Sequence, residues 1–79
     1  MTLPFTRPFT RVAIIGLGLQ GGSIGLALAE YLPAVATTGY DRDPAPRARA
    51  AERKLVGHVY DSAAQAVDGA DLVIFCVPL

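Results

Sequence analysis

The sequence lacks the features that mark a membrane-spanning or secreted chain. Its 79 residues contain one cysteine and no tryptophan, and its longest unbroken apolar run is residues 72–77. A run of this length is far below the roughly 20 residues that a membrane-spanning helix needs. No charged start followed by a long apolar stretch marks a signal peptide. We therefore expect a cytoplasmic protein that does not enter a membrane.

Other absences narrow the class of protein further. A single cysteine, Cys76, excludes an internal disulfide framework and cannot form a cysteine zinc site alone, so no metal site is predicted. The formal net charge is zero, which argues against nucleic-acid binding through phosphate neutralisation. Five of the seven basic residues fall within residues 42–54, where we expect a solvated helix face.

The first strand is predicted directly after a proline-containing arm. Residues 1–10 contain Pro4 and Pro8, which cannot support a helix, and we expect an extended arm there. Residues 12–15 are apolar and rich in β-branched side chains, and Gly16 closes the run. This pattern is typical of a strand that is buried on both faces.

Two longer helices follow, separated by a strand over residues 35–40. The first helix is predicted over residues 21–32, before Pro33, with an apolar stripe formed by Ile24, Leu28, Tyr31 and Leu32. Asp43 and Pro44 predict the start of the second helix, and Gly57 is placed to end it. The small-residue face expected to pack on the sheet consists of Ala45, Ala48, Ala51 and Leu55.

The remaining elements complete a βαβαβ series. We predict a brief edge strand over residues 58–60, a short helix from Ser62 to Val67, and an apolar strand over residues 72–77. Such a series implies an α/β fold with a doubly wound parallel sheet, in which the last strand lies beside the first. The strand that would cover the other side of residues 72–77 is missing. We therefore expect residues 11–79 to be the N-terminal half of a dinucleotide-binding Rossmann domain in a longer enzyme.

The segment between the first strand and the first helix contains a GxGxxG motif. Gly16 allows a tight turn, Gly18 leaves room for a pyrophosphate, and Gly21 permits close packing of the helix on the strand. The motif also contains Leu17, Leu19 and Gln20, and the amides of Leu19 and Gln20 at the positive end of the helix dipole would bind the diphosphate. Ser23 adds a hydroxyl in the first turn. The alternative is that the glycines only close a tight turn.

Asp41 lies 20 residues beyond Gly21, at the end of the second strand. A carboxylate there can accept hydrogen bonds from both ribose hydroxyls of the adenosine, which favours NAD; NADP is the alternative, with Arg42 compensating the charge of its phosphate. Arg42 is otherwise expected to lie over the adenine or to be a solvated arginine. The alternative is a purely structural role for Asp41, as a helix cap or in the turn.

Four further positions receive expectations of different kinds. Val77 and Pro78, at the carboxyl edge of the sheet, either form a wall of the cofactor site or simply end the strand. Cys76 is interpreted as an inert core thiol, and His58 as an ordinary surface histidine.

Three stretches of the chain together resemble one enzyme family. VAIIGLGLQGGSIGLALAE, GYDRDP and DGADLVIFCVPL are similar to the amino-terminal half of the prephenate and arogenate dehydrogenases of tyrosine biosynthesis, with Gly21-Gly22-Ser23 the most telling part. The resemblance runs from about residue 11 to residue 79 and covers only the cofactor half of that family's first domain. Gln20 departs from the aliphatic residue that is more usual there.

The resemblance implies oxidative decarboxylation of a small-molecule substrate, with hydride transfer to NAD, in a full-length homodimer. The family's substrate-polarising histidine and carboxylate-binding arginine come later in its chains, so no catalytic residue is predicted here and the isolated segment is expected to be inactive. Two alternatives are the NAD(P)-binding part of another small-substrate dehydrogenase or reductase, and a non-catalytic nucleotide-binding module. A methyltransferase fits less well, because its glycine loop usually lacks this spacing.

Overall fold

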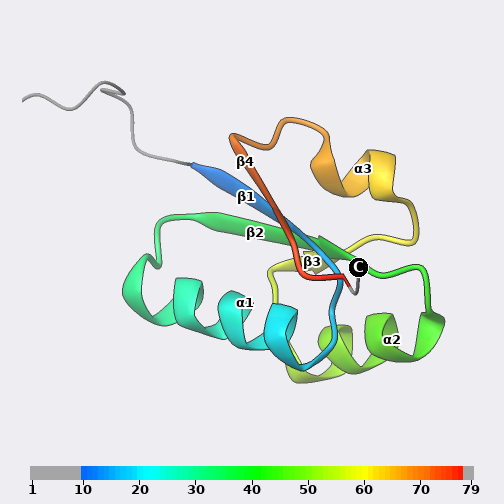
Figure 1. The fold of residues 1–79 in the computed structure, drawn as a ribbon. Helices are drawn as coiled ribbons and strands as arrows, with labels where there is room; N and C mark the ends of the chain where they lie inside the picture. Colours follow the sequence, from blue (N-terminus) through cyan, green and yellow to red (C-terminus); the bar gives the residue numbers. More distant parts are fainter. Residues whose placement is uncertain (1–9, 78–79) are drawn as a thin grey trace, which may run out of the picture.

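A parallel sheet organises the computed structural model, which describes residues 10–77. Within this range the sheet has four strands, β1 (Arg11–Ile15), β2 (Ala36–Tyr40), β3 (His58–Val59) and β4 (Leu72–Phe75), in the order β3-β2-β1-β4 (Figure 1). All three strand pairs are parallel. The predicted α/β class and the position of the last strand beside the first are therefore confirmed. The predicted arm falls almost wholly on residues 1–9, outside the described range.

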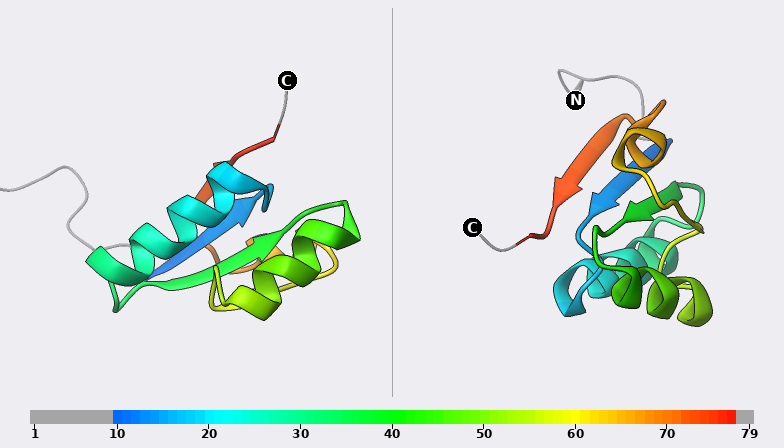
Figure 2. Two further views of the ribbon diagram at one scale, coloured as in Figure 1. Left: turned by 90° about the horizontal axis from the view of Figure 1, so that it is seen from below. Right: turned by 90° about the vertical axis from the view of Figure 1, so that its right-hand side faces the viewer.

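Helices cover both faces of the sheet, as the crossovers of a parallel sheet require. The helices are α1 (Leu19–Tyr31), α2 (Pro44–Arg53) and α3 (Ala63–Val67). Figure 2 shows α1 and α2 side by side on one face and α3 on the other. This arrangement brings the turns that follow β1 and β2 to the same edge of the sheet, because both strands point the same way.

The core lies where β1 meets α1 and α2. Ile14 and Leu17 are the largest side chains with no exposed surface, and they pack in one cluster with Ala50 and Val56. Val12 and Ala13 are buried as well. β1 is thus covered on both faces, as its unbroken apolar sequence predicts, and burial of each large side chain contributes roughly 1.5–3 kcal/mol.

The buried face of α1 differs from the predicted stripe. Ile24 and Leu28 do pack against the core, but Tyr31 and Leu32 are exposed, so the prediction for these two residues is wrong. The fully buried positions of the helix are Gly21, Gly22 and Gly25. A Cβ on Gly25 would overlap the carbonyl oxygen of Leu55. The helix therefore approaches the rest of the protein through glycine backbone, which a search for apolar side chains does not detect.

α2 begins as predicted but ends earlier and buries a different face. The Asp43 carboxylate accepts a hydrogen bond from the amide of Ala45 at 3.1 Å, which confirms the cap. The helix ends at Arg53, before a left-handed Lys54 with φ 54°, so the predicted end at Gly57 is wrong. Its buried residue is Ala50, whereas the predicted face positions Ala45, Ala48 and Ala51 are exposed and only Leu55 packs against the core.

Two side chains tie the last part of the chain to the sheet. The buried hydroxyl of Thr38 donates to the carbonyl oxygen of Ala66 at 2.6 Å, which holds α3 on β2. One carboxylate oxygen of Asp71 accepts from the amide and hydroxyl of Thr10 and from the amide of Arg11. These bonds fix the start of β4 beside the start of β1.

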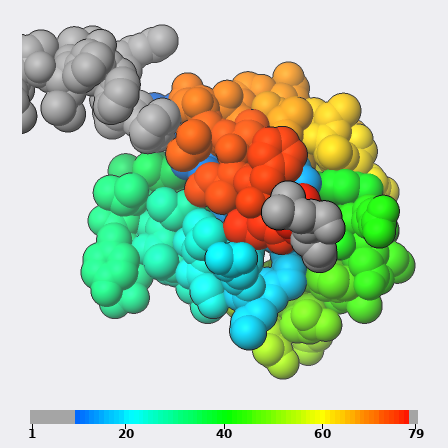
Figure 3. All heavy atoms as spheres, viewed as in Figure 1, coloured from blue at the N-terminus to red at the C-terminus, as the bar shows by residue number. Residues whose placement is uncertain are grey.

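β4 is shorter than predicted and lies at the edge of the sheet. It ends at Phe75, and the side chains of Leu72, Phe75 and Val77 are exposed to solvent. Figure 3 shows β4 on the outside of the molecule, above the start of α1. None of the helices found in residues 10–77 is long and apolar enough to span a membrane.

Candidate functional site

The turn after β1 passes through a position that only glycine can occupy. Gly16 has φ +102°, and a Cβ there would overlap the carbonyl oxygen of Cys76. Its amide donates to the carbonyl oxygen of Tyr40 at 2.8 Å. Gly16 is thus enclosed between the ends of β2 and β4, and the positive φ is one that L side chains rarely adopt.

The other two glycines of the motif differ in what they contact. A Cβ on Gly21 would overlap the carbonyl oxygen of Gly16, so the start of α1 lies directly against the turn. Among the described residues other than its two chain neighbours, no atom would lie within 4 Å of a Cβ on Gly18, and the φ of −70° and ψ of −161° at this position suit any residue. Nothing within the described protein requires glycine at position 18. Its lack of a side chain leaves open space in front of the turn.

The first amides of α1 face this open space without an internal partner. Gly18 is the N-cap residue and supplies no side-chain hydrogen bond. Among the described residues, no acceptor receives a hydrogen bond from the amides of Leu19 or Gln20, and both side chains are exposed. Unpaired amides at a helix N-terminus, together with the helix dipole, favour an anion such as a phosphate.

Asp41 links this turn to the turn after β2. Its Oδ2 accepts from the amide of Leu17 at 2.8 Å, and its Oδ1 accepts from the amide of Asp43 at 2.9 Å. Each carboxylate oxygen has a second lone-pair site for a further donor. The half-buried carboxylate therefore lies at the glycine turn, with both oxygens oriented by backbone amides.

An open hollow of about 940 Å³ joins the two turns. Seven of the predicted site residues line it: Gly16, Gly18, Leu19, Gln20, Asp41, Arg42 and Val77. Leu17 lies beneath it in the core, and Gly21 packs behind the turn. Ser23 lines an adjoining hollow that shares Gly18 and Leu19 with the first one, and its hydroxyl donates to the carbonyl oxygen of Leu19 at 2.9 Å. Pro78 lies outside the described residues.

Four lining residues were not among the predicted ones: Tyr40, Asp43, Pro46 and Cys76. Tyr40 and Asp43 flank the predicted pair Asp41 and Arg42 in the sequence, so all four residues of this turn could have been selected. Cys76 packs against the core and also reaches the hollow, because its amide donates to the carbonyl oxygen of Ile15 at 2.7 Å. Because β4 was predicted to pair with β1, the residue that follows β4 could have been expected beside the glycine turn that follows β1.

Arg47 of α2 makes a group of contacts that the sequence did not reveal. Its Nη1 donates to the carbonyl oxygen of Asp41 at 2.9 Å and to that of Arg42 at 3.3 Å. Its guanidinium carbon lies 5.9 Å from the centre of the Tyr40 ring, which allows a cation–π contact. Arg47 therefore contacts all three residues at the end of β2, while the side chain of Arg42 is exposed over the hollow.

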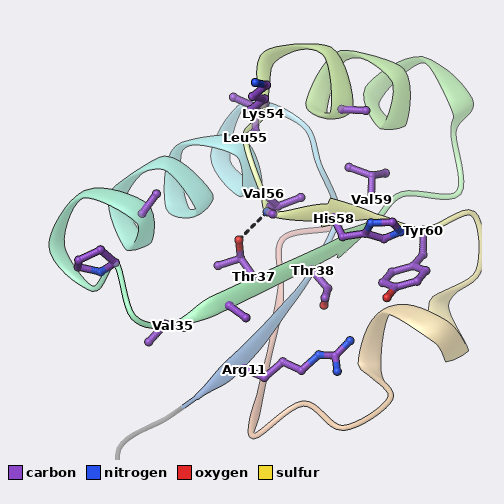
Figure 4. Close-up of a pocket in the computed structure, with 15 residues that line it drawn as sticks. Arg11, Val35, Thr37, Thr38, Lys54, Leu55, Val56, His58, Val59 and Tyr60 are labelled. Atoms are coloured by element: carbon purple, nitrogen blue, oxygen red, sulfur yellow. Dashed lines mark hydrogen bonds between the residues drawn. The ribbon is translucent and has the colours of Figure 1, made fainter.

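A second hollow of about 940 Å³ lies along β2 and β3, and none of the predicted site residues lines it. Figure 4 shows its polar groups, with His58 and Tyr60 next to each other; their ring centres are 4.3 Å apart. The Thr37 hydroxyl accepts from the amide of Gly57 at 2.8 Å, and the Thr38 hydroxyl donates to Ala66. These threonine hydroxyls already have protein partners, whereas the amides of Leu19 and Gln20 have none among the described residues.

No group of three or more metal-ligating side chains occurs within residues 10–77. His58 is exposed, in keeping with its interpretation as a surface residue. The groups at the glycine turn that suit a dinucleotide are the backbone amides, the oriented carboxylate of Asp41 and the exposed side chain of Arg42.

Comparison with protein families and with curated proteins gives consistent matches. Residues 11–79 match the family described as NADP oxidoreductase, coenzyme F420-dependent. Over 71 residues the chain is 44% identical to a cyclohexadienyl dehydrogenase of Zymomonas mobilis subsp. mobilis, a match that covers 90% of this chain and 24% of the relative. The chain thus spans about a quarter of the length of that relative.

Solved structures of dehydrogenases share the fold. A prephenate dehydrogenase from A. aeolicus, in complex with hydroxyphenyl propionate and NAD+, matches with a TM-score of 0.81 and 25% identity over 94% of this chain and 26% of its own. The WlbA dehydrogenase from Chromobacterium violaceum, in complex with NADH and UDP-GlcNAcA, matches with a TM-score of 0.72 and 27% identity over 95% of this chain and 22% of its own.

Proposed function

We propose that this chain, which belongs to the family described as NADP oxidoreductase, coenzyme F420-dependent, is the NAD-binding part of a prephenate-type dehydrogenase. The observation that carries the proposal is the open space at Gly18, where a Cβ would contact none of the described residues beyond its two chain neighbours. A glycine that the fold does not require, placed before unpaired helix amides, is accounted for by close approach of a phosphorylated ligand. Residues 11–79 then form the N-terminal half of the dinucleotide-binding domain.

Each part of the hollow has a role in binding the dinucleotide. The amides of Leu19 and Gln20 bind the diphosphate, and Gly16 and Gly21 hold the turn in place. Val77 lines the wall beside β4. Ser23 and Pro78 remain proposed members of the site: the Ser23 hydroxyl, now bonded to Leu19, would turn toward a phosphate oxygen, and Pro78 would extend the wall that Val77 begins.

Asp41 supports NAD as the cofactor in preference to NADP. Its two oxygens, each with one amide donor, can still accept from the two ribose hydroxyls of adenosine. A 2′-phosphate at the same place would meet the negative charge of the carboxylate. The A. aeolicus relative was solved with NAD+ and the WlbA relative with NADH, which agrees with this preference. Arg42 is exposed and is available to lie over the adenine.

For the intact protein we propose oxidative decarboxylation of prephenate or arogenate in tyrosine biosynthesis. The cofactor accepts the hydride, and the residues assigned here bind and orient it. The support is the 44% identity to a cyclohexadienyl dehydrogenase and the fold shared with a prephenate dehydrogenase. We also propose that the intact enzyme is a cytoplasmic homodimer that binds neither nucleic acid nor membrane; the support is its family resemblance and the neutral net charge of these 79 residues.

The cofactor proposal is tested by calorimetric titration of the intact protein with NAD. We expect binding by the native protein and a loss of at least about tenfold in affinity in Gly18→Val, whose side chain would fill the open space. Asp41→Ser should bind NAD more weakly as well. Equal affinity in the native protein and both variants would remove this site assignment.

The reaction is tested separately, by following NADH formation with prephenate and with arogenate. Turnover of either substrate supports the proposed activity and identifies the preferred one. A protein that binds NAD but oxidises neither compound would belong to another dehydrogenase or to a binding module, and the proposed reaction would be wrong.

A further inference from the structure

We propose that Arg47 is a positioning residue that holds Asp41 in the place required for selecting NAD over NADP. This inference rests on the proposed function of the glycine-turn hollow, because it concerns the adenosine end of the same site. Arg47 does not line the hollow itself. It acts through the backbone of the turn that carries Asp41.

The contacts of Arg47 are arranged around that turn. Its Nη1 donates to the carbonyl oxygens of Asp41 and Arg42, at 2.9 and 3.3 Å, and its guanidinium lies over the ring of Tyr40. A single half-buried side chain of α2 therefore contacts three consecutive residues that line the hollow. Hydrogen bonds from a charged donor are stronger than neutral ones, so these contacts restrict the turn.

The bonds on the other side of the turn depend on the backbone position that Arg47 maintains. The Asp41 carboxylate accepts from Leu17 and from Asp43, and the second of these amides belongs to the turn itself. If the turn moves, the carboxylate loses its orientation by both amides. Arg47 thus determines whether the negative charge of Asp41 stays at the glycine turn or moves away from it.

Cofactor selection follows from where that charge is held. With the turn fixed, the carboxylate can accept from the ribose hydroxyls of NAD and repels the 2′-phosphate of NADP. With the turn loosened, NAD loses well-placed acceptors, whereas NADP loses a repulsive contact. Removal of Arg47 should therefore weaken NAD binding more than NADP binding, an effect that general loss of stability would not produce.

The experiment measures the dissociation constants of NAD and NADP for the intact native protein and for Arg47→Ala, by calorimetry on folded protein. In Arg47→Ala we expect about tenfold weaker binding of NAD and less than about a twofold change for NADP, so the preference for NAD falls by about fivefold or more. The affinity for ADP-ribose should fall together with that for NAD, because ADP-ribose contains the adenosine half of the cofactor. Arg47→Lys, which keeps a charged donor, should recover part of the preference.

Arg49→Ala is the matched control, since it removes the same charge from the same helix. Arg49 is exposed, and within the described residues it makes no hydrogen bond to the turn that carries Asp41. The hollow that it lines shares Gly18 and Leu19 with the glycine-turn hollow, so it adjoins the diphosphate part, which NAD and NADP have in common, and not the turn of Asp41. We expect the ratio of NAD to NADP affinity in Arg49→Ala to equal that of the native protein. The inference is overturned if Arg47→Ala weakens both cofactors equally or neither, or if Arg49→Ala has the same effect. Failure of the native protein to bind NAD would instead overturn the proposed function.

Discussion

The carboxylate of Asp41 accepts a hydrogen bond from the amide of Leu17 at 2.8 Å, across 24 positions of the sequence. This bond joins the turn after β1 to the turn after β2. It uses the amide that precedes Gly18 and leaves the amides of Leu19 and Gln20 without a partner among the described residues. The phosphate-binding part and the ribose-binding part of the proposed site are therefore one connected unit.

Gly18→Ser should separate stability from cofactor binding. A serine can adopt the backbone angles at position 18 and can cap α1, so we expect thermal stability to be unchanged or higher by a few tenths to about 1 kcal/mol. NAD affinity should fall at least about tenfold, because the side chain occupies the open space and its oxygen competes for the helix amides. Thermal unfolding measures the stability of the variant, and NAD titration measures its affinity. A variant with lower stability and unchanged NAD affinity would contradict both expectations.

Gly21→Ala should show the opposite pattern. Its Cβ would overlap the carbonyl oxygen of Gly16, so α1 must move away from the turn. We expect a loss of about 1–3 kcal/mol in the free energy of unfolding, the usual cost of overpacking a close contact. Urea unfolding of the intact protein measures it. Gly18→Ala is the matched control, with a Cβ that meets no protein atom, and equal losses in the two variants would show that the glycines are not distinguished in this way.

Asp41→Asn should reduce both cofactor selection and stability. An asparagine side chain has one acceptor oxygen, so only one of the amides of Leu17 and Asp43 keeps a good acceptor. We expect a stability loss of about 1 kcal/mol and a clear fall in the ratio of NAD to NADP affinity, because the negative charge is gone. Parallel titrations with both cofactors test it. A ratio that stays at the native value would exclude Asp41 as the selecting residue.

Thr38→Val should lower the stability of the protein, because it removes the hydrogen bond that holds α3 on the sheet. The Thr38 hydroxyl is almost fully buried and donates to the carbonyl oxygen of Ala66 at 2.6 Å, whereas valine has nearly the same shape and no donor. Leaving a buried acceptor without a partner costs about 1–3 kcal/mol. Chemical denaturation gives the value. Thr38→Ser keeps the hydroxyl and loses only a methyl group, so a larger loss in Thr38→Ser than in Thr38→Val would show that packing dominates here.

The fold could be predicted from the sequence where the pattern is unambiguous. The alternation of strands and helices, beginning with the apolar run of β1 and the glycine turn, predicted the order of the strands. The cap at Asp43 predicted the first residues of α2. The buried face of α1 could not be predicted in the same way, since it consists of glycines and not of the apolar Tyr31 and Leu32. In α2, several closely spaced alanines fit more than one helix face, and only packing selects Ala50.

The sequence predicted which backbone turns of the candidate site lie together, but it did not predict the contacts of side chains that cross between elements. The motif spacing placed the glycine turn and Asp41 in one hollow. Arg47 was interpreted only as part of a solvated basic stretch, because its contacts depend on how α2 folds back over the end of β2. Nothing in its local sequence distinguishes it from Arg49.

The position of β1 in the sheet has a consequence for biosynthesis. β1 is formed by residues near the start of the chain, yet one of its two neighbours, β4, pairs Val12 with Leu72. A ribosome must therefore release most of this segment before the central strand gains its second partner. Contacts of such large sequence separation slow folding, and until they form, the apolar side chains of both strands are exposed to aggregation.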